Sequence, residues 1–174
     1  TRVILFSLPN GNTTPQTIGR QMKPRLDWHF DIQHIAAQTR FLRNVMKERT
    51  IVVVYLETKQ KSWPAWVANT PGSIEKVKKI VGDVSNIFEQ WHPQIVLNGH
   101  SGGGRFVFSY INSVPDIPAK IERIAFLDSS YGYEDTLHGP KLVKWLKSGI
   151  GKFLCTLADN DSVVMYIGKP LVCP

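Results

Sequence analysis

The chain has 174 residues, 43% of them hydrophobic, and a formal net charge of +7. This length suffices for one domain with a hydrophobic core, so we expect residues 1–174 to form a single domain. No apolar run approaches the roughly 18 residues of a membrane span and no signal peptide opens the sequence, so we expect a soluble protein whose compartment stays open. The lysines are scattered rather than gathered in a patch with aromatic residues, which argues against a nucleic-acid partner, and two cysteines form no disulfide framework.

The first half of the chain alternates strand-like and helix-like segments. Residues 3–8 form an apolar run of strand length that ends in turn residues. Residues 14–30 contain two prolines and a glycine, which predicts an irregular surface loop. Over residues 31–47 apolar positions recur at three- and four-residue steps, as in an amphipathic helix. Residues 51–56 are β-branched and apolar throughout, which is typical of a strand covered on both faces.

Possible metal ligands cluster at the start of the first predicted helix. Asp31 and His34 are three residues apart and can share a helix face. A metal site needs at least one more convergent ligand, and the sequence does not point to one. We therefore expect these side chains to cap and pack the helix start, and we expect neither a metal nor another cofactor.

Two tryptophans, Trp63 and Trp66, lie in the segment that precedes the next helix. If this segment forms the wall of a substrate pocket, exposed indole rings suit a carbohydrate or aromatic ligand. The alternative is that both rings lie on the core beneath a long loop. Ser73 follows as the expected N-cap of an amphipathic helix that continues to about residue 91.

The second half of the chain repeats the alternation. Apolar strands are predicted to begin at residue 95, over residues 124–128 and over residues 153–158, with Pro140 at the first position of a helix between the last two. Five strands alternating with helices predict an α/β fold, a doubly wound and mainly parallel sheet with helices on both faces. Ligands of such sheets bind at the carboxyl ends of the strands. Polar residues follow four of these ends, at Asn10-Gly11, Ser101, Asp128 and Asp159/Asp161.

The third strand runs into a serine that is flanked by glycines two residues away on each side. In a G-x-S-x-G turn between a strand and a helix, the backbone is so tight that Gly99 and Gly103 have no room for side chains. The turn exposes the hydroxyl of Ser101, and the backbone N–H of Gly102 lies at a helix N-terminus, where it can stabilise a developing oxyanion. The pattern predicts a nucleophile with half of an oxyanion hole. A phosphate-binding loop fits less well, because no Gly-Lys-Ser/Thr follows the glycines.

With Gly99-His100-Ser101-Gly102-Gly103 as a nucleophile elbow, the chain resembles the α/β-hydrolase superfamily. The resemblance implies a second oxyanion N–H from the loop after an early strand, often within a His-Gly sequence. Asn10-Gly11 occupies that place here, so either residue is a candidate and an ordinary turn is the alternative.

The resemblance also implies a catalytic triad in the order serine, acid, histidine. Asp161 matches the usual position of the acid and Asp128 a less common one. No histidine follows Asp161 in the sequence. Three explanations are open: the histidine lies beyond Pro174, His138 serves out of order from a loop near the active edge, or catalysis has been lost. His100 is interpreted as a packing residue.

The leading functional hypothesis is a serine hydrolase that cleaves a small-molecule ester or amide through an acyl-enzyme on Ser101. The alternative from another class is a non-catalytic binding module on the same fold, with a pocket lined by Trp63, Trp66 and Tyr131. The sequence identifies neither the substrate nor the oligomeric state.

Overall fold

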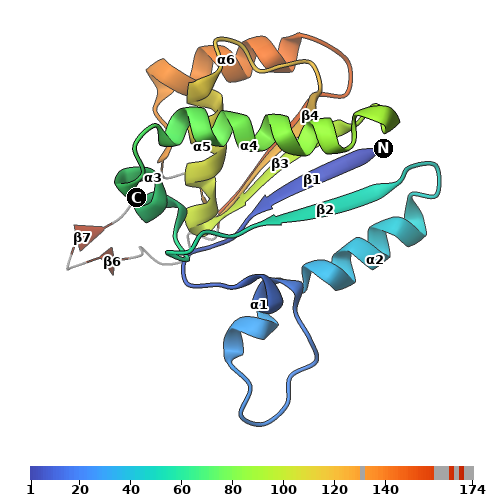
Figure 1. The fold of residues 1–174 in the computed structure, drawn as a ribbon, viewed down its shortest axis with the longest axis vertical. Helices are drawn as coiled ribbons and strands as arrows, with labels where there is room; N and C mark the ends of the chain where they lie inside the picture. The colour runs from blue at the N-terminus through green and yellow to red at the C-terminus, as the bar shows by residue number, and fades with distance from the viewer. Residues whose placement is uncertain (130–131, 159–164, 167–168, 171–174) are drawn as a thin grey trace.

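Five strands pair into one parallel sheet in the order β2-β1-β3-β4-β5 (Figure 1). The structure is a computed structural model that describes residues 1–129, 132–158, 165–166 and 169–170. Because the chain adds β2 on one side of β1 and the later strands on the other, the sheet is doubly wound, and the predicted fold class is confirmed. The strands are β1 (Arg2–Ser7), β2 (Ile51–Leu56), β3 (Gln94–His100), β4 (Ile121–Leu127) and β5 (Phe153–Leu157).

Helices cover the two faces of this sheet unequally. One face carries α3 (Trp63–Asn69), α4 (Ser73–Ile87), α5 (Gly104–Ser113) and α6 (Asp135–Lys147). On the opposite face α2 (Ile35–Val45) packs through Ile35 against Phe6 and Leu8. The alternation of side chains along β1 explains both layers, since Val3 and Leu5 join the first face and Ile4 and Phe6 the second.

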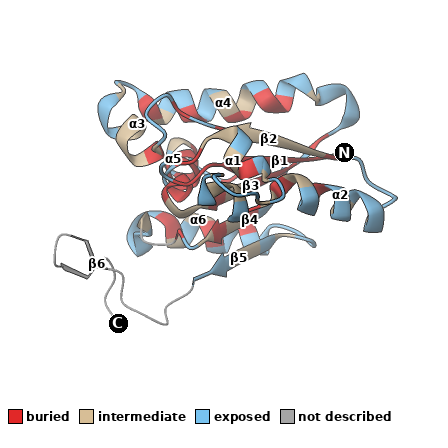
Figure 2. Ribbon diagram, turned by 90° about the horizontal axis from the view of Figure 1, so that it is seen from below, coloured by how far each residue is buried: buried red, intermediate tan, exposed pale blue. Residues whose placement is uncertain are grey.

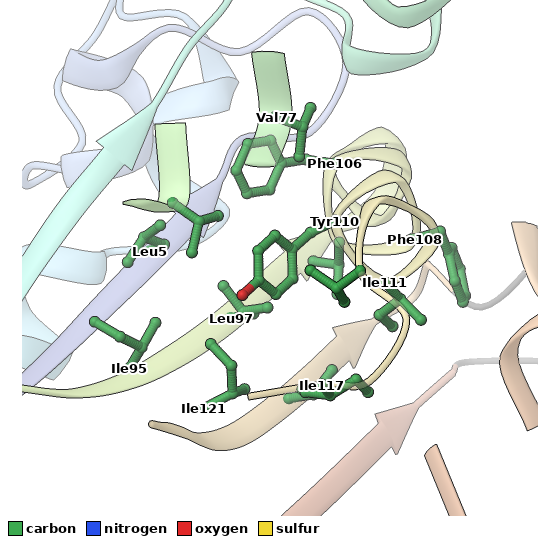
Figure 3. Close-up of a cluster of buried hydrophobic side chains, with 14 of the residues drawn as sticks. Leu5, Val77, Ile95, Leu97, Phe106, Phe108, Tyr110, Ile111, Ile117 and Ile121 are labelled. Atoms are coloured by element: carbon green, nitrogen blue, oxygen red, sulfur yellow. The ribbon is translucent and has the colours of Figure 1, made fainter. Parts of the chain in front are cut away.

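The main core lies under the four helices of the first face. Figure 3 shows Tyr110 and Ile111 of α5 on the side of Leu97 of β3 and Ile121 of β4, while Phe106 of α5 points toward α4. These five side chains are almost fully buried. At roughly 1.5–3 kcal/mol per buried large apolar side chain, this packing fixes α5 on the sheet and with it the turn between β3 and α5.

Part of the second face is left open. Phe153 and Leu157 of β5 are 53% and 64% exposed, and β5 is the edge strand of the sheet, next to β4 (Figure 2). Within the described ranges, α2 is the helix that packs on this face, and it covers the β1–β2 half.

Four sequence-based expectations about local structure were wrong. Residues 14–30 are not irregular throughout, because Thr13 and Gln16 form a capping box and Pro15 lies in the first turn of α1 (Thr14–Ile18). The predicted helix over residues 31–47 is shorter, since Trp28–Asp31 forms a 3₁₀ turn, η1, and α2 begins at Ile35. Gly72, not Ser73, is the N-cap of α4. Pro140 lies inside α6, which begins at Asp135.

The chain also contains the short antiparallel pair β6 (Met165–Tyr166) and β7 (Lys169–Pro170). No helix of the described residues has the length and apolar character needed to cross a membrane.

Candidate active site

The turn after β3 has the backbone strain expected of a nucleophile elbow. β3 ends at His100, a 3₁₀ turn covers Ser101–Gly103, and α5 starts at Gly104. Ser101 has φ +48°, in the left-handed region that a residue with a Cβ rarely adopts. Such conformations persist only where the surrounding structure holds them, and they are frequent at active sites.

Glycines permit this turn because backbone atoms approach both of them. A Cβ on Gly99 would lie 2.7 Å from the Gly104 nitrogen, and a Cβ on Gly103 would lie 2.1 Å from the Ser7 carbonyl oxygen. Both distances are shorter than a van der Waals contact, and the opposing atoms are backbone. The prediction that neither position has room for a side chain is confirmed.

Two serines from neighbouring strands fasten the turn. Ser7 at the end of β1 places its hydroxyl oxygen 2.9 Å from the Asn98 carbonyl and 2.8 Å from the Gly103 carbonyl. From the other side, Ser129 donates its hydroxyl to the Gly99 carbonyl at 2.8 Å, just after β4. The carboxyl ends of β1, β3 and β4 therefore lie together around the turn that contains Ser101. In this strand order the winding direction changes between β1 and β3, and doubly wound sheets bind ligands at such a position.

Asn10 is the part of the predicted oxyanion loop that reaches this turn. A Cβ on Gly102 would lie 2.0 Å from the Asn10 Oδ1 atom and 2.8 Å from its Nδ2 atom, so the Asn10 amide group lies directly against Gly102. Gly11 behaves differently. Its N–H donates at 2.8 Å to the carbonyl of Lys61 in the loop after β2, so this N–H is already paired and does not serve as the second donor in this structure.

A hydrogen-bonded chain next to Ser101 was missed by sequence analysis. Asn12 Nδ2 donates to Gln33 Oε1 at 3.1 Å, and Gln33 Nε2 lies 2.7 Å from His100 Nδ1. Burial lowers the pKa of His100, and the carboxylate of Asp128 partly offsets this effect. The lowered pKa favours the neutral form of the His100 ring at pH 7. Asn12 and Gln33 give no signal in the sequence, because polar residues in a turn and at a helix start are ordinary.

Asp128, one of the two candidate acids, lies directly after β4 in a strained backbone conformation with φ +48°. Its N–H donates to the Leu157 carbonyl, 2.6 Å away, and its side chain is exposed near His100. The other candidate, Asp161, lies outside the described residues.

The structure contradicts the expectation that His138 hangs over the active edge from a loop. His138 is the fourth residue of α6 and is only 1% exposed. Its ring packs 4.6 Å from that of Phe108, and its Nδ1 accepts the N–H of Glu134 at 2.9 Å. Burial lowers the pKa of His138. The side chain closes the first turn of α6, and this enclosed position does not suit a base for Ser101.

Two of the three aromatic residues that were predicted to line a substrate pocket, Trp63 and Trp66, can be placed in the structure. Trp63 belongs to the core, since it is 4% exposed and its indole N–H donates to the Leu56 carbonyl at 3.1 Å. Trp66 packs edge-on against it at 5.3 Å and is partly buried. Both lie in α3, which Ser62 caps, rather than in a loop. Tyr131 lies outside the described residues.

The remaining histidines are placed as follows. His29 and His34 pair with Asp27 and Asp31 on the segment between α1 and α2, at 2.5 and 2.7 Å. His92 precedes β3 and so belongs to the edge opposite Ser101. No group of three or more potential metal ligands occurs among the side chains that the structure describes.

Comparisons of the chain with protein-family models, with curated proteins and with solved structures found no significant match. The resemblance to α/β-hydrolases therefore stays a prediction that rests on the residues and their geometry.

Proposed function

We propose that the protein is a serine hydrolase that cleaves a small-molecule ester or amide, with Ser101 as the nucleophile. The observation that carries the proposal is the left-handed backbone of Ser101 at a strand-to-helix turn, fastened by Ser7 and Ser129. Holding a serine in this conformation costs of order 1–3 kcal/mol, which a turn that merely caps a helix does not need.

The surroundings of Ser101 support an acyl-transfer role. The N–H groups of the first turn of a helix have no partner within the helix, and that of Gly102 belongs to the turn that leads into α5. The Asn10 amide group lies against Gly102 and provides an N–H donor of the kind that completes an oxyanion hole. Asn10 thus replaces the Asn10-Gly11 pair in the proposal.

For the acid of the triad, Asp128 and Asp161 both remain candidates. Asp128 has in its favour a position at the carboxyl end of β4, next to the strand that leads to Ser101. In this proposal the base is a histidine that accepts the Ser101 proton and then protonates the leaving group.

The test is hydrolysis of p-nitrophenyl acetate by the wild type, Ser101→Ala and a control, Ser113→Ala. Ser113 lies at the last position of α5, where its hydroxyl donates to the Tyr110 carbonyl at 2.7 Å. We expect Ser101→Ala to lose at least about 1,000-fold in kcat/KM with an unchanged melting temperature, because removal of the nucleophile leaves only binding and oxyanion effects. Equal hydrolysis by wild type and Ser101→Ala contradicts the proposal and favours the non-catalytic binding module.

A further inference from the structure

The segment that joins α1 to η1 projects from the body of the molecule, at the bottom of the view in Figure 1. We call residues 18–32 the α1–η1 loop. Two contacts close its base. Gln16 Nε2 donates to Asp27 Oδ2 at 2.6 Å, and the Arg20 guanidinium lies 4.1 Å over the centre of the Phe30 ring. The loop is therefore held at both ends, and the side chains between them face solvent.

Three cationic side chains are exposed on this loop, those of Arg20, Lys23 and Arg25. None of them forms an ion pair within the described part of the chain. Arg20 and Lys23 line a hollow of about 460 Å³, and no carboxylate lines it with them. Arginine and lysine both bind phosphate groups well, so this hollow suits a phosphate-bearing partner.

The two carboxylates of the loop are paired with histidines and not with these cations. Asp27 lies 2.5 Å from His29 Nδ1, and Asp31 lies 2.7 Å from His34 Nε2. The three cations therefore keep their charge available to solvent. An anionic partner complements such a cluster.

Large apolar side chains are exposed on the same loop. Trp28 is 66% exposed, and Ile18 and Ile32 are 37% and 41% exposed. Tryptophan is enriched at membrane–water interfaces because its ring is amphipathic. Aliphatic side chains gain from burial at the acyl boundary but do not stack on nucleobases, so this combination favours a lipid surface over a nucleic acid.

We propose that the α1–η1 loop binds the protein to an anionic phospholipid surface. The three cations contact the lipid phosphates, and the Trp28 ring enters the headgroup region. Binding of this kind combines burial of apolar area with attraction to anionic lipids. Gln33 follows the loop directly and lies 2.7 Å from His100, the neighbour of Ser101, so the bound surface lies on the same edge of the sheet as the serine turn. The proposal does not rest on hydrolase activity.

The test is cosedimentation of the Ser101→Ala protein with vesicles in about 0.1 M NaCl at pH 7.5. One set of vesicles contains equal parts of phosphatidylcholine and phosphatidylglycerol, and the other contains phosphatidylcholine alone. The Ser101→Ala background separates binding from any hydrolysis of lipid. We expect at least about 10-fold tighter binding to the anionic vesicles, because each Lys or Arg near an anionic surface strengthens binding by roughly 5-fold. Absence of binding, or equal binding to both sets, overturns the proposal.

Two triple variants with the same change in net charge locate the surface. The test variant replaces Arg20, Lys23 and Arg25 by glutamine and should bind anionic vesicles at least about 20-fold more weakly. The control replaces by glutamine three exposed lysines of α4, a helix on the other side of the sheet (Figure 1): Lys76, Lys78 and Lys79. At this salt concentration charges beyond about 10 Å are screened, so the control should lose less than about 3-fold. An equal loss in both variants would show that only overall charge matters and refute the assignment.

Trp28→Ser tests the apolar part of the surface, with Trp91→Ser as its control. Trp91 is 51% exposed and lies in η2 (Glu89–Trp91), ahead of β3. We expect Trp28→Ser to weaken binding to anionic vesicles by at least about 3-fold, and Trp91→Ser to leave it unchanged. Because both side chains are exposed, both variants should keep the wild-type melting temperature. Equal affinities of the two variants would contradict insertion of Trp28, and retention of single-stranded DNA without vesicle binding would assign the loop to a nucleic acid and overturn the proposal.

Discussion

Replacement of Gly103 by alanine tests whether the serine turn is pressed against β1. The backbone of Gly103 is helical, with φ −62° and ψ −24°, so alanine is conformationally allowed there. The new Cβ, however, would lie 2.1 Å from the Ser7 oxygen, 2.8 Å from the Ser7 carbonyl carbon and 3.1 Å from the Leu8 oxygen. All three atoms are backbone, so the end of β1 must move away from α5.

Gly82 in the middle of α4 is the matched control, because a Cβ there meets no atom within 4 Å. Overpacking should make Gly103→Ala less stable by about 1–3 kcal/mol, while Gly82→Ala should gain about 0.5–1 kcal/mol from its higher helix propensity. Urea denaturation followed by far-ultraviolet circular dichroism gives both free energies of unfolding. If Gly103→Ala is as stable as the wild type, the close approach of the turn to β1 is refuted.

Two further predictions concern buried side chains. Burial lowers the pKa of His138 in the folded protein below its value of about 6.5 in the unfolded chain. Between the folded and the unfolded pKa the unfolded chain binds more protons, so the free energy of unfolding should fall as the pH drops below about 6.5. His138→Leu should reduce this slope in urea titrations at pH 5 and pH 7.5, and an identical slope would show that His138 is not the titrating group. Trp63→Phe removes the indole donor of the buried Leu56 carbonyl, which keeps the backbone N–H of Leu8 as a partner. The lost hydrogen bond and the lost packing should cost about 1–2 kcal/mol, whereas the same change at Trp91, which is 51% exposed, should cost less than about 0.5 kcal/mol. Equal losses in a thermal or urea melt would contradict the role assigned to Trp63.

The fold class could be predicted because the strands of a doubly wound sheet are continuous apolar runs. The run at residues 51–56 matches β2 at both ends, and each of the other four predicted strands matches an observed one within a few residues. The errors arose where one residue type has two local roles. Pro15 was interpreted as a residue that interrupts a helix, but it lies in the first turn of α1, which the capping box at Thr13 begins. Pro140 was interpreted as the first residue of a helix, but it lies inside α6.

The candidate site was predictable only where its chemistry depends on the backbone. Glycine spacing located the turn at Ser101, because steric exclusion of a Cβ is a local property. The roles of His138 and Trp63 depend on which side of a helix faces the core, and the periodicity of short segments does not determine this. The chain from Asn12 through Gln33 to His100 joins segments that are far apart in sequence, and only the folded structure brings them together.

The most direct test of the central claim is covalent labelling of the folded protein by a fluorophosphonate, followed by intact-mass and peptide mass spectrometry. A serine that is activated as a nucleophile reacts with this probe, whereas an ordinary hydroxyl does not. We predict one adduct per chain on Ser101, no adduct in Ser101→Ala, and unchanged labelling in Ser113→Ala. A folded wild-type protein that stays unmodified, or that is modified at a residue other than Ser101, would contradict the assignment of Ser101 as the nucleophile.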